Sequence, residues 1–318
     1  MSPKAARRAA FPYCIVDVFT TEPLEGNALA VLPDARGLDT ETMQRVAREF
    51  NLSETSFVFP AERPGIAAHV RIFTPSRELP FAGHPTIGTS FVLRARGLVE
   101  PHLSHFVLQE AVGDVPIRVE AGDPETLWLT TPPISFGERF EREIVARALR
   151  LQPDDLLDIE PQRVTAGSPG IFVALRDAEC VDRAWLDLAG TRDLHGGRAS
   201  ADCVFVFAPT GSGAYSRMFA PEHGIVEDPA TGSATGPLAA YMMRHGLVAS
   251  ADGTRFTSEQ GTKMGRRSLL RVFVHGELGC DGIEIGGASV LIATGEVNLP
   301  RDAQMAPLAS NDSMSRSS

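Results

Sequence analysis

The stretch that decides the fold is Arg71–Val99, RIFTPSRELPFAGHPTIGTSFVLRARGLV, because a second stretch of the chain resembles it. That second stretch is Arg217–Val248, RMFAPEHGIVEDPATGSATGPLAAYMMRHGLV. Both open with arginine, an apolar residue, phenylalanine, a small residue and proline. Both close with an apolar helical segment that ends in Gly-Leu-Val, where glycine is a natural helix terminator. Chance similarity between two strand–loop–helix units is the alternative, but we interpret the pair as an internal repeat that gives two related halves.

The glycine-rich helix entrances of the two stretches coincide when the stretches are aligned without gaps from their common end. Gly83-His84 then falls on Gly232-Ser233. Free N–H groups and the positive end of the helix dipole make a helix N-terminus an anion site. We therefore expect the two entrances to face one cleft, where they would grip a carboxylate and hold the negative charge of an intermediate.

Short strand candidates and few helices make up the rest of the chain. The segment Leu38–Phe50, LDTETMQRVAREF, repeats apolar residues at helical spacing, with Asp39 or Thr40 as its N-cap. Strands and helices do not alternate regularly, so we predict an α+β fold with strands wrapped around helices rather than a doubly wound sheet. Strands are expected near residues 13–19, 70–73, 127–129, 164–166 and 203–207, and a further helix near 141–150.

Composition excludes several classes of partner. A net charge of −10 over 318 residues argues against a nucleic-acid surface. No run of about 18 apolar residues occurs, so we expect no membrane span. The start, MSPKAARRAA, lacks the apolar segment of a signal peptide. The four cysteines are far apart in sequence, which is typical of a reducing cytoplasm, where they act as small buried hydrophobes; they are Cys14, Cys180, Cys203 and Cys280.

Glu54 is a candidate acid/base. It lies in NLSETSFVF, directly before an apolar strand and among small hydroxyl residues. Partial burial there would disfavour the ionised carboxylate and raise its pKa toward neutral pH, as a general acid/base requires. The alternative is a surface glutamate at the start of a strand, and local sequence alone favours that alternative.

Three polar residues of the glycine-rich loops are further candidates. His84 would donate to a substrate oxygen or relay a proton, or else would only cap the helix. Asp228, in EDPATGSATG, occupies the matching loop of the second half, where aspartate before proline is equally a turn former. Asn27, in LEGNALAVL, would reach a ligand through its amide, although Gly-Asn is also a turn signal.

The sequence lacks the motifs of several well-defined catalytic and cofactor-binding sites. TGSATG has no P-loop lysine, and no GxGxxG follows a strand. GTSFVL and GSATG do not match the GxSxG of a nucleophile elbow. No HExxH or tight His/Asp cluster occurs, so we expect neither a catalytic metal nor a cofactor.

Six segments in order closely resemble the phenazine-biosynthesis (PhzF-like) isomerase family. The resemblance runs from about Phe11 to about Leu299, which is nearly the whole chain, and the order and spacing of the segments make coincidence a poor explanation. The segments are GNALAVLP, FNLSETSFV, RIFTPSRELPFAGHPTIGT, EDPATGSATGPLAAY, EQGTKMGRRSLLRV and GIEIGGASVLIATGEV.

The resemblance implies a diaminopimelate-epimerase-like fold. Two pseudo-symmetric halves would each wrap a sheet around a central helix, with the active site between them. We place the first half at residues 10–125, completed by a C-terminal strand at 288–300, and the second half at 126–287. Residues 301–318 are Ser-rich and are expected to form a disordered tail. Members of the family are usually homodimers, so we expect a homodimer here.

The resemblance also implies roles for residues. The family's acid/base glutamate corresponds to Glu54, and its histidine and aspartate correspond to His84 and Asp228. Asn27 matches the family's turn beside the substrate, although Ala28 follows it where the family commonly has proline. The backbone anion cradle matches Gly83, Gly232 and Ser233.

Racemases of the same fold carry a cysteine at each helix entrance, whereas this chain has His84 and Ser233 there. A two-cysteine racemase needs one thiolate and one thiol on opposite faces of its substrate. We therefore predict a one-base proton shift on a small carboxylate-bearing, cyclic amino-acid-like substrate. The alternatives are a small-carboxylate-binding protein without turnover and a homodimeric protein that binds partners through its outer surface.

Overall fold

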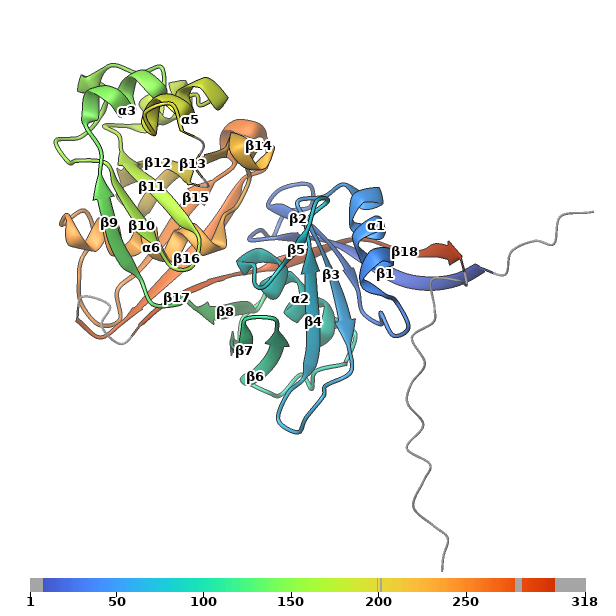
Figure 1. The fold of residues 1–318 in the computed structure, drawn as a ribbon. Coiled ribbons are helices and arrows are strands. Elements are labelled where there is room, and N and C mark those ends of the chain that lie inside the picture. The colour runs from blue at the N-terminus through green and yellow to red at the C-terminus, as the bar shows by residue number, and fades with distance from the viewer. Residues whose placement is uncertain (1–7, 199, 201, 278–281, 301–318) are drawn as a thin grey trace, which may run out of the picture.

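The computed structural model describes residues 8–198, 200, 202–277 and 282–300. Figure 1 shows two lobes: blue, teal and dark green elements together with the red C-terminal strand in one, and light green to orange elements in the other. The predicted tail, 301–318, and Cys280 lie outside the described residues. The other three cysteines are free thiols.

The first lobe combines the N-terminal elements with the last strand. Its helices are α1 (Thr40–Phe50) and α2 (Gly83–Ala95). Its strands are β1 (Arg8–Val18), β2 (Asn27–Leu32), β3 (Glu54–Phe59), β4 (Ala68–Phe73), β5 (Glu78–Leu79), β6 (His105–Glu110), β7 (Gly113–Glu120), β8 (Thr126–Thr130) and β18 (Ser289–Pro300).

The second lobe has the same kinds of element with more helices. Its helices are α3 (Arg142–Ala148), α4 (Ala178–Arg183), α5 (Leu188–Leu194) and α6 (Gly232–Arg244), with 3-10 turns η1 (Pro153–Asp155), η2 (Pro221–His223) and η3 (Thr262–Met264). Its strands are β9 (Ser135–Arg139), β10 (Gln162–Thr165), β11 (Pro169–Ala174), β12 (Cys203–Thr210), β13 (Gly213–Ala220), β14 (Ile225–Asp228), β15 (Arg255–Gln260), β16 (Ser268–His275) and β17 (Gly282–Gly287).

The strands form one continuous mixed sheet that wraps through both lobes. From the edge, the order is β18, β1, β2, β3, β4, β6, β7, β8, β17, β16, β15, β13, β12, β11, β10 and β9. The halves join where β8 pairs with both β7 and β17. The protein has the predicted α+β, diaminopimelate-epimerase-like fold. The boundary between residues 125 and 126 stays a prediction.

Matching strand arrangements in the two lobes support the internal repeat. Near its start β4 pairs with parallel β6, and near its end it pairs with short antiparallel β5. In the same way β13 pairs with parallel β15 and then with short antiparallel β14. Each unit then leads into a central helix, α2 or α6.

Ion pairs inside the two units also match. Arg71 donates from Nε and Nη2 to the two carboxylate oxygens of Glu78, and Arg217 binds Glu227 in the same bidentate way. Each pair fixes the strand that leads into a helix entrance. The longer spacing in the second unit arises because the 3-10 turn η2 lies between β13 and β14.

Both central helices end as predicted. Gly97 and Gly246 each have φ +67°, which a residue without Cβ adopts at no steric cost. The next N–H then reaches back to a carbonyl of the last turn, Leu98 to Leu93 at 2.8 Å and Leu247 to Met242 at 2.9 Å. These are Schellman caps.

Apolar packing holds the central helices in place. Ile87, Val92 and Leu93 of α2 share one buried cluster with residues of β16 and β17. Leu238 and Tyr241 of α6 belong to a second cluster with Phe205 and Phe207 of β12. Because the first cluster draws on both lobes, the halves share part of their core in addition to the clusters that belong to one lobe.

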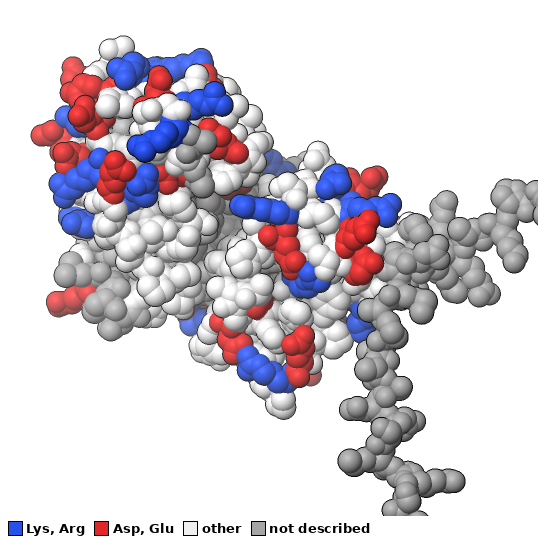
Figure 2. All heavy atoms as spheres, in the orientation of Figure 1, with Lys and Arg blue, Asp and Glu red and all other residues white. Residues whose placement is uncertain are grey.

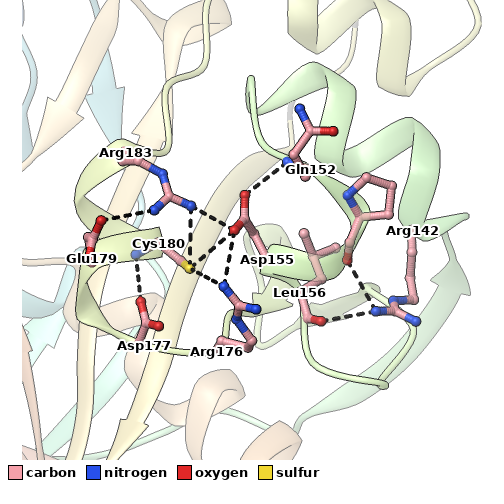
Figure 3. A network of polar contacts seen from close by, with 10 residues as sticks. Arg142, Gln152, Asp155, Leu156, Arg176, Asp177, Glu179, Cys180 and Arg183 are labelled. Atoms are coloured by element: carbon pink, nitrogen blue, oxygen red, sulfur yellow. Dashed lines mark hydrogen bonds and ion pairs between the residues drawn. The ribbon is translucent and has the colours of Figure 1, made fainter.

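The helices α3, α4 and α5 and the turn η1 form an outer cap on the second lobe. A polar network around Asp155 holds this outer cap together (Figure 3). Asp155 accepts from the Gln152 backbone N–H at 2.9 Å and from Arg183 at 2.6 Å. The Cys180 thiol lies 3.5 Å from the same carboxylate. On the outside of both lobes, basic and acidic side chains are interspersed, as Figure 2 shows for one face.

Candidate active site

The N-termini of the two central helices meet backbone to backbone, and helices α2 and α6 begin at the two glycines expected from sequence. A Cβ added to Gly83 would lie 3.2 Å from the Ser233 nitrogen and 3.3 Å from the Gly232 Cα. A side chain at position 83 would therefore crowd the backbone of the α6 start, which would have to shift by a few tenths of an ångström. Neither N-cap residue, Ala82 or Thr231, caps its helix through its side chain, so the first-turn N–H groups are left to face the site.

Glu54 is the first residue of β3, and its side chain points at the start of α2. Only 14% of this side chain is exposed, so it is not the surface glutamate that local sequence favoured. Its Oε2 lies 3.3 Å from His84 Nε2. Burial, followed by the negative charge of Asp228, raises the pKa of Glu54 to about 8.

His84 is the second residue of α2, and its side chain is 7% exposed. Burial lowers its pKa to about 3, so the imidazole is neutral. Asn27 Nδ2 approaches its Nδ1 to 3.4 Å, which favours the tautomer with the proton on Nε2, facing Glu54. The contact between His84 Nε2 and Glu54 Oε2 lacks hydrogen-bond geometry, and both buried atoms are without a hydrogen-bond partner among the described residues.

Asn27 joins the two halves. From the first residue of β2, its Nδ2 donates to Asp228 Oδ1 at 3.1 Å and to the Ala230 carbonyl at 3.0 Å. Both acceptors belong to the loop that leads into α6. The alanine at position 28 therefore does not prevent Asn27 from reaching the site.

Asp228 is the last residue of β14 and is buried. Burial raises its pKa to about 6, although hydrogen bonds from Thr231 and Asn27 oppose the shift. Ser233 is the second residue of α6 and is half-buried beside the helix contact. The structure thus brings together all seven residues singled out from sequence.

Gln260 and Thr231 complete the site, and the sequence reasoning did not single them out. Gln260 Nε2 donates to the Asp228 carbonyl at 2.8 Å, and Gln260 Oε1 accepts from the Thr231 N–H at 3.1 Å. The Thr231 hydroxyl donates to Asp228 Oδ2. Gln260 ends β15 and therefore fixes the entrance of α6 from a neighbouring strand. The one available signal was its segment EQGTKMG, a polar strand end before a turn.

The site is unusual because its two carboxyl groups, those of Glu54 and Asp228, are not paired with a positively charged side chain. Within the part of the chain that the structure describes, no arginine or lysine is bonded to Glu54, His84 or Asp228. A carboxyl group with a pKa near neutrality can take and return protons at physiological pH. Two uncapped helix starts beside it can bind an anion. The arrangement is therefore suited to moving a proton on an anionic substrate.

The described residues contain neither a cluster of metal-ligating side chains nor a membrane-spanning helix. No three His, Cys, Asp or Glu side chains within 8–198, 200, 202–277 and 282–300 are placed to hold a metal ion. No helix in those same ranges is long and apolar enough to cross a membrane.

Known proteins share this architecture. Residues 16–295 match the family of phenazine biosynthesis-like proteins, PhzC-PhzF. A trans-2,3-dihydro-3-hydroxyanthranilate isomerase of Pseudomonas aeruginosa is 35% identical, covering 90% of this chain and 99% of that protein. A PhzF-family phenazine biosynthesis protein of Bacillus anthracis is 24% identical with a TM-score of 0.81, covering 91% of this chain and 99% of that one.

The fold extends to more distant enzymes. A hydroxyproline epimerase of Agrobacterium vitis superposes with a TM-score of 0.58 at 15% identity, over 94% of this chain and 96% of that chain. At such low identity the likeness concerns the fold alone. The match over most of the chain, together with the P. aeruginosa relative, settles the family. The chain belongs to the phenazine biosynthesis-like (PhzC-PhzF) family and is an isomerase of that family.

Proposed function

We propose that this isomerase needs no cofactor and moves a proton on a small carboxylate-bearing, cyclic amino-acid-like substrate, with Glu54 as its single acid/base. One observation carries the proposal. The carboxyl of Glu54, with its pKa raised to about 8, lies buried beside His84, and the uncapped starts of α2 and α6 meet next to it. The P. aeruginosa relative is named for a substrate of this kind.

The helix starts would bind the substrate carboxylate. The backbone N–H groups of Gly83, Gly232 and Ser233 belong to the first turns of α2 and α6, where no intrahelical acceptor exists. When a proton leaves a carbon conjugated to the carboxylate, negative charge spreads toward this anion site. Fixed N–H dipoles stabilise that charge without reorganisation, which lowers the barrier.

The proton transfer itself would involve only Glu54. In its ionised form, about a tenth of the population at pH 7 given a pKa of about 8, Glu54 takes the proton from the substrate carbon. It then returns that proton to another carbon on the same face, so protons and charge balance within one turnover. His84, which is neutral, and Asp228 orient the amino or hydroxyl groups of the substrate. Asn27 holds Asp228 in position.

We further propose that the enzyme works as a cytoplasmic homodimer without nucleic-acid or membrane partners. The net charge of −10 supports the absence of a nucleic-acid surface. Light scattering coupled to size-exclusion chromatography measures the mass in solution. A mass of one chain at micromolar concentration would exclude the dimer.

Deuterium exchange tests the reaction. Candidate unsaturated cyclic amino acids, beginning with trans-2,3-dihydro-3-hydroxyanthranilate, are incubated with the enzyme in deuterated buffer and followed by NMR. We expect exchange or isomerisation with the unchanged protein and a loss of about 10²- to 10⁴-fold in Glu54→Gln. Glu110→Gln is the matched control, because Glu110 is also buried and its pKa is also raised to about 8.

The outcomes separate the alternatives. If Glu54→Gln turns over as fast as the unchanged protein, Glu54 is not the base. If calorimetry shows tight carboxylate binding but no compound of the panel exchanges, the protein is a small-carboxylate-binding protein on an isomerase scaffold. If Glu110→Gln loses as much activity as Glu54→Gln, the loss reflects general damage to buried carboxyls rather than proton transfer.

A further inference from the structure

Cys203 occupies in the second half the position that Glu54 occupies in the first. Glu54 opens β3, which lies between parallel β2 and antiparallel β4. Cys203 opens β12, which lies between parallel β11 and antiparallel β13. The registers agree as well: the residues after Glu54 and Cys203 pair with Phe73 and Phe219, the phenylalanines of the matching RIF and RMF motifs.

The two side chains point toward the central helix of their own half. Cys203 packs against the cluster that contains Phe205 and the α6 residue Leu238. The next residue, Val204, points to the other face of the sheet and belongs to the cluster beneath α3, α4 and α5. The side chain of Glu54 reaches His84 at the start of α2. In the pseudo-twofold relation between the halves, the side chain of Cys203 therefore corresponds to that of Glu54 and packs on the side of the central helix α6.

The surroundings of the thiol tie it to the same site. Its Sγ lies 3.6 Å from the Pro169 carbonyl, and a Cβ on Gly170 would come within 3.0 Å of it. The charge of Asp228 acts on both Cys203 and Glu54. Burial, then the charge of Asp202, and more weakly that of Asp228, raise the pKa of Cys203 to about 12, so the thiol is neutral.

We propose that Cys203 contacts the substrate from the second half, on the side of the site opposite Glu54. This inference rests on the proposed function and deepens it. A second observation points to a ligand between the halves: Nε2 of His84, in a side chain only 7% exposed, and the adjacent Oε2 of Glu54 are both buried without a hydrogen-bond partner among the described residues.

The consequence for specificity concerns the part of the substrate that faces Cys203. A thiol is small and a weak donor, so it suits an uncharged ring edge rather than a carboxylate or an ammonium group. The substrate carboxylate is then left to the helix starts, and the reacting carbon faces Glu54. Proton removal and return occur on that one face.

Side-chain size at position 203 provides the main test. In the exchange assay, Cys203→Leu should raise the KM at least about tenfold, because one or two added methylenes in a pocket cost that much. Cys203→Ser, which keeps the volume, should keep KM and kcat within about threefold. The matched control is Cys180→Leu, a buried cysteine of the outer cap, with circular dichroism and thermal unfolding reporting the fold of each variant. A folded Cys203→Leu with unchanged KM overturns the proposal.

A labelling measurement covers the case in which Cys203→Leu does not fold. Methyl methanethiosulfonate is added to the unchanged protein; the thiolate attacks its sulfenyl sulfur, a disulfide forms and methanesulfinate leaves. Anthranilate at a concentration that calorimetry shows to be saturating should slow labelling of Cys203 at least about tenfold but not that of Cys180, as read by peptide mass spectrometry. Equal rates with and without anthranilate overturn the contact. Since this readout needs no turnover, it remains decisive if the Glu54→Gln test removes the proposed reaction.

Discussion

Asp155 in the outer cap and Glu54 in the site are both largely buried acids, yet their pKa values shift in opposite directions. Their side chains are 10% and 14% exposed. Asp155 accepts from the Gln152 backbone N–H and from Arg183, and these bonds hold its pKa below the usual value (Figure 3). Glu54 has a neutral imidazole and a second carboxylate as neighbours instead, and its pKa rises to about 8.

The difference teaches that side-chain exposure alone does not decide what a carboxyl does, because Glu54 lies deep between the halves, whereas Asp155 lies just below the surface among its donors. Donors that stay with the carboxylate make it a structural anion, as in the outer cap. Burial without such donors raises the pKa of a carboxyl toward neutrality, so that it can take and return a proton, as in the site. The first arrangement stabilises the fold, while the second gives up stability for reactivity.

Replacing Glu54 and Asp155 each by the corresponding amide should produce the largest contrast in exchange rate and stability. Glu54→Gln should lower the exchange rate by about 10²- to 10⁴-fold while thermal stability stays equal or rises, because a neutral amide replaces a buried carboxyl. Asp155→Asn should keep the exchange rate and lower the free energy of unfolding by about 1 to 3 kcal/mol. Exchange kinetics and urea unfolding measure both. An unchanged rate in Glu54→Gln, or a lost rate in a folded Asp155→Asn, would break the comparison.

Stability should depend on pH in opposite senses in the two places. Glu54 and Glu110 hold protons up to pH about 8 in the folded protein but only to about 4.5 when unfolded. The folded state therefore binds more protons between these values, so their stabilising contribution is full below 4.5 and is lost as pH rises toward 8. Asp155, whose pKa is lowered, contributes stability at neutral pH that is lost on acidification.

Urea unfolding between pH 5 and about 9 measures this dependence. The double variant Glu54→Gln/Glu110→Gln should lose less stability as the pH rises. At the alkaline end its free energy of unfolding should have fallen by a few kcal/mol less than that of the unchanged protein. A decline that is equally steep in the double variant would show that these carboxyls have ordinary pKa values in the folded protein.

Removing the second carboxylate should shift the titration of the first. The charge of Asp228 is the second cause of the high pKa of Glu54. In Asp228→Asn the pH at which exchange reaches half of its plateau should therefore move to lower pH, whatever happens to the plateau itself. The full pH–rate profile distinguishes the two effects. A midpoint that stays in place would leave burial as the sole cause.

Removing one cation from the outer cap should give the smallest effect. Arg183 bonds Asp155 from a side chain that is 45% exposed, so solvent weakens the ion pair. Arg183→Met should lower the free energy of unfolding only slightly and leave exchange unchanged. Thermal unfolding at neutral pH and at pH 3 measures it, and the difference from the unchanged protein should shrink at the lower pH as Asp155 protonates.

Local sequence was sufficient for the parts of the fold that depend on neighbouring residues. The glycines of the helix entrances and the Gly-Leu-Val ends predicted both central helices, and Asp39 caps α1 by accepting from the Thr42 N–H, as expected. These features depend on backbone conformation within a few residues, which residue type controls directly.

The environment of the site could not be predicted in this way. Glu54 lies against His84 of another element, and Asn27 binds a residue 201 positions away. The role of Gln260 depends on β15 lying next to the loop before α6. Local sequence made Glu54 only a candidate and favoured a surface position, and the family resemblance, which encodes such long-range contacts, gave it the role of acid/base. The relation between Glu54 and Cys203 required strand registers.

The backbone contact between Gly83 and Gly232 also has an electrostatic consequence. Two helix ends of the same sign face each other at this point, so the halves repel one another along the line that joins them. An anion placed between them turns repulsion into a shared attraction, and binding and closure become one linked equilibrium. A carboxylate that is never turned over should therefore raise the unfolding temperature. The substrate carboxylate would then hold the two halves together before the substrate reacts.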